Sequence, residues 1–147
     1  MPCNEDYFAA LYSRRSTARP MKHRAVATAE WSPKRNQCHK NVDYCVSLYP
    51  HLKAIRGWMI VPEDECGRCW LDAHSVIEDE GELYDITLSG QAECDCKEFL
   101  QHVGDPQEFW AVVKHCSQTS YPFPTDEETR SIGELVAEEE EETEFDC

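Results

Sequence analysis

The sequence contains no apolar run that approaches the roughly 18 residues needed to cross a membrane. Its N-terminal residues also lack an apolar segment flanked by a basic start and a small-residue cleavage site. These two absences predict a cytoplasmic protein, and the net charge of -15 predicts that it does not bind membranes. Glycine is scarce as well, at 6 of 147 residues, which excludes collagen-like and glycine-rich repetitive chains. With 41% hydrophobic residues, the chain is apolar enough to fold as one domain around its own core.

The sequence also has few positively charged residues, with 14 lysines and arginines against 29 aspartates and glutamates. The imbalance is greatest in residues 126–147, which hold eleven acidic residues and one basic residue. An acidic surface repels phosphates, so nucleic acid is excluded as a general partner. Like charges at this density do not pack, which predicts a mobile acidic tail over residues 125–147. Such a tail would bind a basic protein partner, and residues 1–124 would form a single catalytic-type domain.

Three helices are predicted from apolar spacing and from helix-start signals. Residues 1–36 are expected to hold a short helix, over 5–15, followed by an arm. Apolar residues then recur at helical spacing over residues 38–49, with Asn36 as the expected N-cap. A third helix begins at Asp105–Pro106, because aspartate favours the N-cap and proline the first helical position.

Strands follow the second helix, with a turn centred on Glu80–Gly81. They are expected over residues 53–62, 69–78 and 82–88. A loop of two or four residues at this turn would place His74 and Asp85 on one face of the sheet, whereas a three-residue loop would separate them. In the second strand, the face that carries Leu71 and Ile77 is the expected core face. The predicted fold is therefore α+β, with one helix packed on a small antiparallel sheet.

Cys38, His74 and Asp85 form a candidate cysteine-nucleophile site. A nucleophilic thiolate needs a lowered pKa, an imidazole within hydrogen-bonding reach and a third group that orients the imidazole. Cys38 lies at the predicted start of a helix, where partial positive charge and backbone N–H groups favour a thiolate and an oxyanion. A cysteine on an apolar helix face is, however, most often a core residue. The order of the three residues and their predicted elements favour a cysteine hydrolase or acyltransferase that acts on a peptide or small amide.

Two segments resemble transglutaminase-like cysteine enzymes of the papain-like superfamily. They are NQCHKNV at 36–42 and AHSVIEDEGELYDIT at 73–87. The resemblance covers about residues 31–88, and the same stretch is similar to uncharacterised bacterial proteins. It implies a papain-like core, a catalytic triad and a reaction that needs no cofactor.

Each site residue has a role that the resemblance implies. Cys38 would be the nucleophile, His74 the general base and Asp85 the acid that orients the imidazole. Gln37 would precede the nucleophile and contribute to oxyanion or substrate binding. His39 departs from the pattern, because an aromatic residue usually follows the nucleophile; it is expected on the helix surface, as is Asn41.

Four other cysteines form two close pairs that favour a structural zinc site. The zinc would be held by Cys66, Cys69, Cys94 and Cys96. Alternative ligands are His102, His115 and Cys116. In this second hypothesis, the chain is a non-enzymatic zinc-binding adaptor or interaction protein whose acidic tail contacts its partner.

Overall fold

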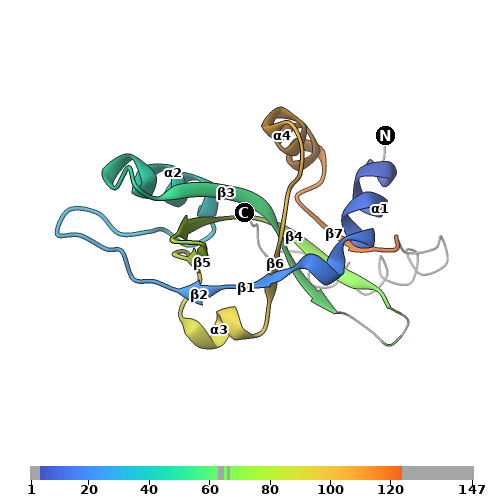
Figure 1. Cartoon of the computed structure of the whole chain (residues 1–147), viewed down its shortest axis with the longest axis horizontal. Coiled ribbons are helices and arrows are strands. Elements are labelled where there is room, and N and C mark those ends of the chain that lie inside the picture. The colour runs from blue at the N-terminus through green and yellow to red at the C-terminus, as the bar shows by residue number, and fades with distance from the viewer. Residues whose placement is uncertain (1–3, 63–64, 66, 124–147) are drawn as a thin grey trace, which may run out of the picture.

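The computed structural model describes residues 4–62, 65 and 67–123 (Figure 1). Cys66 and the predicted tail over 125–147 lie outside these residues. The described chain has an α+β fold, as predicted. Its helices are α1 (Glu5–Ser13), a short 3-10 helix (Arg15–Thr17), α2 (Cys38–Leu48), α3 (Gln91–Asp95) and α4 (Pro106–His115). Its strands are β1 (Arg19–Pro20), β2 (Lys22–His23), β3 (Lys53–Pro62), β4 (Cys69–Asp79), β5 (Glu82–Asp85), β6 (Glu98–Gln101) and β7 (Gln118–Tyr121).

The strands form one mixed sheet that nearly closes into a barrel. Their order is β1-β6-β3-β4-β5-β2, and β7 pairs with β4. β1 and β2 lie at opposite ends of this order, although only Met21 separates them in the chain. The segment from Arg19 to His23 therefore joins the two edges of the sheet. The three predicted strands pair antiparallel, but the prediction of a small, purely antiparallel sheet is wrong, because β2 runs parallel to β5 and the described residues form seven strands.

The longer predicted elements are confirmed. α2, β3 and β4 lie within one residue of the predicted ranges. α4 begins with Pro106, and the Asp105 side chain caps it by accepting a hydrogen bond from the backbone N–H of Gln107 at 2.9 Å. β5 ends three residues earlier than predicted, at Asp85. The carboxylate of Asp85 accepts hydrogen bonds from the next backbone N–H groups, which turns the chain out of the ladder.

A two-residue turn sets the register between β4 and β5. Glu80 and Gly81 both have positive φ, 50° and 83°, as in the turns that suit tight hairpins. Ile77 consequently pairs with Tyr84, which is the register predicted for a two-residue loop. In that register His74 and Asp85 lie on the same face of the sheet.

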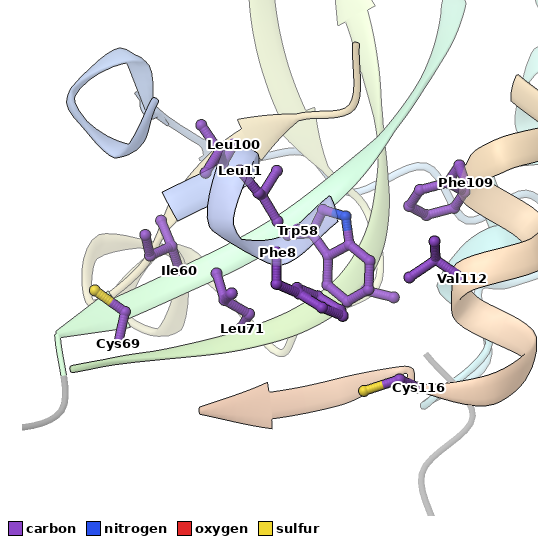
Figure 2. Packing of buried hydrophobic residues seen from close by; sticks show 11 residues of the cluster. Phe8, Leu11, Trp58, Ile60, Cys69, Leu71, Leu100, Phe109, Val112 and Cys116 are labelled. Carbon is purple, nitrogen blue, oxygen red and sulfur yellow. The ribbon is translucent and has the colours of Figure 1, made fainter. Parts of the chain in front are cut away.

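Both faces of β4 are buried, which corrects the expectation of a single core face. On one face, Leu71 packs in a cluster around Trp58 that α1 and α4 cover (Figure 2). On the other face, Val76 packs with Met59 and Phe99 in a second cluster. A third cluster joins α2 to the sheet through Ile77. Because the sheet nearly closes, apolar residues also cover the second face of β4. His74 lies on this face with Val76 and is buried as well.

Gly57 should be intolerant of a side chain, because it pairs with both His74 on β4 and Gln101 on β6. A Cβ atom at Gly57 would collide with the backbone carbonyl of Leu100 and would lie 2.8 Å from the ring of Phe99. Overpacking of this kind costs about 1–3 kcal/mol. We therefore expect Gly57→Ala to lower the melting temperature by several degrees in a calorimetric scan.

Gly90→Ala is the matched control, since a Cβ atom there meets nothing within 4 Å and the backbone is extended, with φ at 171°. Its melting temperature should stay close to that of the wild type. Equal melting temperatures for Gly57→Ala and Gly90→Ala would contradict the tight packing of β3 against β6.

Candidate active site

Cys38 is the first residue of α2, and its side chain is fully buried. Gln37 occupies the N-cap position and makes no side-chain capping hydrogen bond. Asn36, the predicted N-cap, instead takes a left-handed backbone conformation, with φ at 59°, one residue earlier. Cys38 therefore lies where the helix N-terminus contributes partial positive charge and backbone N–H donors.

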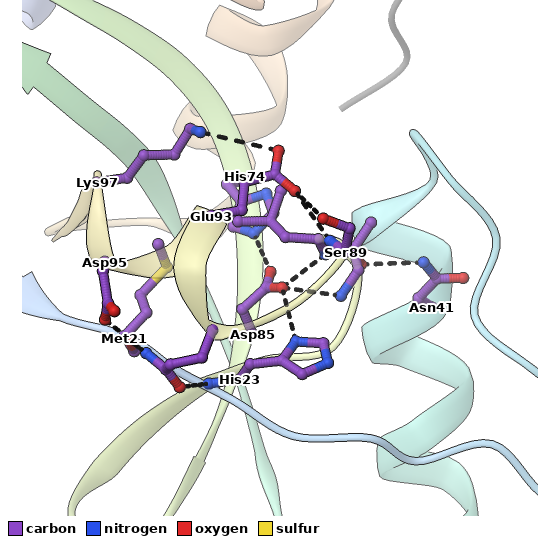
Figure 3. Close-up of polar contacts among 12 residues, drawn as sticks. Met21, His23, Asn41, His74, Asp85, Ser89, Glu93, Asp95 and Lys97 are labelled. Carbon is purple, nitrogen blue, oxygen red and sulfur yellow. Dashed lines mark hydrogen bonds and ion pairs between the residues drawn. The ribbon is translucent and has the colours of Figure 1, made fainter.

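His74 and Asp85 form a buried hydrogen-bonded pair, which confirms that they meet (Figure 3). His74 Nε2 lies 2.6 Å from Asp85 Oδ1, and both side chains are buried. Asp85 Oδ2 accepts hydrogen bonds from the backbone N–H of Thr87 at 3.1 Å and of Leu88 at 2.6 Å. Three hydrogen bonds thus fix the Asp85 carboxylate, and one of them also orients the His74 ring. Because Nε2 donates to the carboxylate, Nδ1 is the basic nitrogen of the neutral imidazole.

One edge of β4 has a gap between its two neighbouring strands, and His74 lies in that gap. Along one edge, β4 pairs with β7 as far as Asp72 and with β5 from Ile77 onward. His74 lies between these two ladders and lines the same cavity as Asn36. On the opposite face of β4, the residue after Cys38 hydrogen-bonds to the residue after His74, since His39 Nδ1 lies 2.5 Å from Ser75 Oγ. Asn36 and His39, which flank Cys38 in the chain, thus both lie beside the stretch of β4 that contains His74.

Asn41 links the loop before Cys38 to the loop after Asp85, and it is buried rather than on the helix surface as predicted. Its side-chain amide donates to the carbonyl of Lys34 at 2.8 Å and to Thr87 Oγ1 at 3.0 Å. Its side-chain oxygen accepts from the backbone N–H of Lys34 at 2.9 Å. Sequence reasoning missed this role, although Asn41 lies one helical turn after Cys38 and so on the same side of α2.

His39 is half-buried and neutral at physiological pH. His39 Nδ1 is hydrogen-bonded to Ser75 Oγ at 2.5 Å, and Arg56 Nη1 donates to the same hydroxyl oxygen at 2.8 Å. Burial, together with the positive charge of Arg56 and the nearby His74, lowers the pKa of His39 to about 4. The ring of His39 also contacts that of Trp110 edge-on, with centroids 4.9 Å apart. These contacts anchor the first turn of α2 to β4 and α4.

A cavity of about 910 Å³ opens beside His74, and a small amide or a peptide side chain would fit within it. Its lining includes both charge signs, from Arg35, Asp72, Glu93 and Lys97. Asp72 lies two residues from His74 on β4, so both side chains belong to one face of that strand. The cavity therefore combines a candidate general base with charged groups that can orient a polar substrate.

The described members of the predicted four-cysteine zinc site do not gather at one place. Cys69 packs in the Trp58 cluster, whereas Cys94 packs with Met59 in the second cluster. Cys96 is exposed, and Cys66 lies outside the described residues. His102, an alternative ligand, lies 2.8 Å from the Tyr7 hydroxyl through Nδ1 and 2.9 Å from the carbonyl of Asp105 through Nε2. Zinc binding by the cysteine pairs thus has no support in their arrangement.

No family model, curated protein or solved structure matches this chain. Within residues 4–62, 65 and 67–123, no helix is both long enough and apolar enough to cross a membrane.

Acid should destabilise the protein in part through His39. Its folded-state pKa of about 4 lies below its ordinary value of 6.5, so between these values the unfolded chain binds a proton that the folded chain does not. The contribution of His39 to stability is therefore complete above pH 6.5 and declines as the pH falls towards 4. We expect the melting temperature to fall less steeply over this range in His39→Gln than in the wild type, as measured by circular dichroism.

Replacement of the exposed His51 by Gln provides the control and should leave the pH dependence as it is in the wild type. Parallel curves for the wild type and His39→Gln would show that protonation of His39 is not linked to folding.

Proposed function

We propose that the protein is a cysteine hydrolase or acyltransferase, in which Cys38 attacks the carbonyl of a peptide or small amide. The observation that carries this proposal is the buried His74–Asp85 hydrogen bond, which lies beside a cavity that is also lined by Asn36, two residues before Cys38. The order of helix, strand and strand also agrees with the transglutaminase-like, papain-like resemblance of the sequence. The triad is built by neighbouring elements, since α2 packs against β4 and β5 follows β4 directly.

The reaction begins with transfer of the Cys38 thiol proton to Nδ1 of His74. The thiolate then forms a bond to the carbonyl carbon, and the carbonyl electron pair moves to oxygen. Backbone N–H groups at the start of α2 would stabilise this oxyanion, and Gln37, at the N-cap, would assist. His74 returns its proton to the departing amine, which leaves an acyl-thioenzyme.

The second half of the reaction releases the acyl group. Water or an acceptor amine attacks the thioester carbonyl and gives its proton to His74, which passes a proton back to the sulfur of Cys38. Asp85 keeps Nε2 protonated throughout, so that Nδ1 always faces the reacting atoms. Its place in the mechanism is therefore to orient the ring and to stabilise the imidazolium.

Cys38 should be alkylated by iodoacetamide faster near pH 6 than the other described cysteines. Burial raises the pKa of Cys45, and burial followed by the Asp85 charge raises the pKa of Cys94 to about 12, so both serve as slow internal references. Because each pKa unit changes the thiolate fraction tenfold below the pKa, His74→Ala should slow labelling of Cys38 by about tenfold or more. Asp85→Asn should have an intermediate effect. Site-resolved mass spectrometry of labelled peptides gives the rates.

The exposed His115 provides the matched control, and His115→Ala should label at the wild-type rate. An activated aryl ester should also add one acyl group to the wild type and none to Cys38→Ala, as read by intact mass. Equal labelling of Cys38 in the wild type and His74→Ala, together with no acyl adduct, would rule out the enzyme and favour a non-enzymatic interaction protein.

A further inference from the structure

A second histidine approaches Asp85 from the opposite side to His74. β2 pairs with β5 in parallel, and His23 is the direct partner of Asp85 in that ladder. Side chains of directly paired residues lie on the same side of a sheet, so both enter the same space. His23 Nδ1 lies 3.9 Å from Asp85 Oδ2 (Figure 3). α3 covers this space and contributes the buried thiol of Cys94.

Three different ligand atoms therefore converge. Among the described residues, a ring nitrogen of His23, a carboxylate oxygen of Asp85 and Cys94 Sγ form a group in which all three atoms lie within 4.8 Å of one another. In tetrahedral zinc sites the bonds of about 2.0–2.3 Å place the ligand atoms about 3.3–3.8 Å apart. Shifts of about an ångström or less in side-chain position would bring these three atoms to that spacing.

The imidazole of His23 gives independent support. Its Nδ1 atom is buried and has no hydrogen-bond partner. A buried polar atom left in this state costs about 1–3 kcal/mol, so a binding partner for it would stabilise the fold. The residue itself is held firmly, because its backbone N–H donates to Gln91 Oε1 at 2.7 Å and the next N–H, of Arg24, donates to the carbonyl of Asp85 at 3.0 Å.

We propose that His23, Asp85 and Cys94 bind a divalent metal ion of the zinc class. One imidazole nitrogen, one carboxylate oxygen and one thiolate sulfur are the ligand types that zinc accepts together, and the thiolate disfavours magnesium and calcium. Asp85 would bind the ion through Oδ2, which also accepts the backbone N–H groups of Thr87 and Leu88, and would keep Oδ1 on His74, since carboxylates that ligate a metal are themselves hydrogen-bonded. A water molecule would complete a tetrahedral set. The site differs from the four-cysteine site that the sequence suggested, since it shares Cys94 alone with it.

Zinc uptake by the full chain tests this assignment. Protein freed of metal by a chelator is titrated with Zn²⁺ in competition with a chromophoric indicator, and separately with Co²⁺, whose thiolate complexes absorb in the near ultraviolet. We expect one equivalent of zinc and a cobalt–thiolate band in the wild type. His23→Gln and Cys94→Ser should each weaken zinc binding by at least about tenfold, as loss of a supporting group at a metal site does.

Cys96→Ser is the matched control, because Cys96 is an exposed cysteine two residues from Cys94 and belongs to the four-cysteine alternative. It should bind zinc as the wild type does, and circular dichroism should show that every variant is folded. Absence of zinc uptake, full uptake by His23→Gln, or loss of uptake in Cys96→Ser would each overturn the proposal. If Cys94→Ser does not fold, His23→Gln decides the question.

The experiments can reject the proposed metal site and the proposed enzyme activity independently, although both involve Asp85. Alkylation of Cys38 that depends on His74, in a protein that takes up no zinc, would remove the metal site and leave the enzyme. Zinc uptake by Cys38→Ala with no acyl adduct on the wild type would remove the enzyme and leave the metal site.

Discussion

The two-residue turn at Glu80–Gly81 determines that His74 and Asp85 lie on the same face of the sheet, and the candidate site depends on this. Side chains alternate between faces along a strand, so a single added residue in this turn would move Asp85 to the opposite face from His74. The positive φ values of Glu80 and Gly81 match the twist of a tight hairpin and hold the shorter register. Ten residue pairs between β3 and β4 then fix β4 itself, from Lys53 opposite Glu78 to Pro62 opposite Cys69. The position of Asp85 relative to His74 is therefore set by the backbone before any side chain interacts.

Asp85 is the residue that contacts most of the polar groups around the candidate site. Its backbone ends β5 and bonds Arg24 beside β2, and its carboxylate contacts His74 on one oxygen and two backbone N–H groups on the other. The carboxylate of Asp85 therefore has three neighbours: the backbone N–H groups that end β5, the imidazole of His74, and His23. A carboxylate held this tightly cannot swing toward solvent when its surroundings change. An ion bound at Oδ2 would draw charge from the carboxylate and so reduce its support of an imidazolium at His74, which couples the two proposals physically.

The sequence predicted the helices and strands that are long enough to show a clear apolar spacing. α2, β3 and β4 each span ten residues or more, and their apolar spacing sufficed to place them. β1 and β2 have two residues each and α3 has five, which is too short for any period to show. The parallel contact between β2 and β5 joins residues 62 positions apart, as His23 and Asp85 are, and no local pattern encodes it. Asn41 was missed because a polar residue in an amphipathic helix is expected to face water.

Stability alone does not explain the buried pair of His74 and Asp85. Both lie at 0% exposure, beside Val76 and Leu83, in surroundings that apolar side chains could fill. Replacing a buried hydrogen-bonded pair by apolar residues of similar size is often neutral or stabilising, because removing polar and charged groups from water costs free energy that their interaction only partly returns. A fold that needed only a core would have no use for an imidazole and a carboxylate at these positions. The gap between β7 and β5 has the same implication, since continuous pairing along β4 would satisfy more backbone groups than the described strands do. The chain thus gives up ladder hydrogen bonds and apolar packing at one place, where a cysteine at a helix N-terminus and a cavity are found.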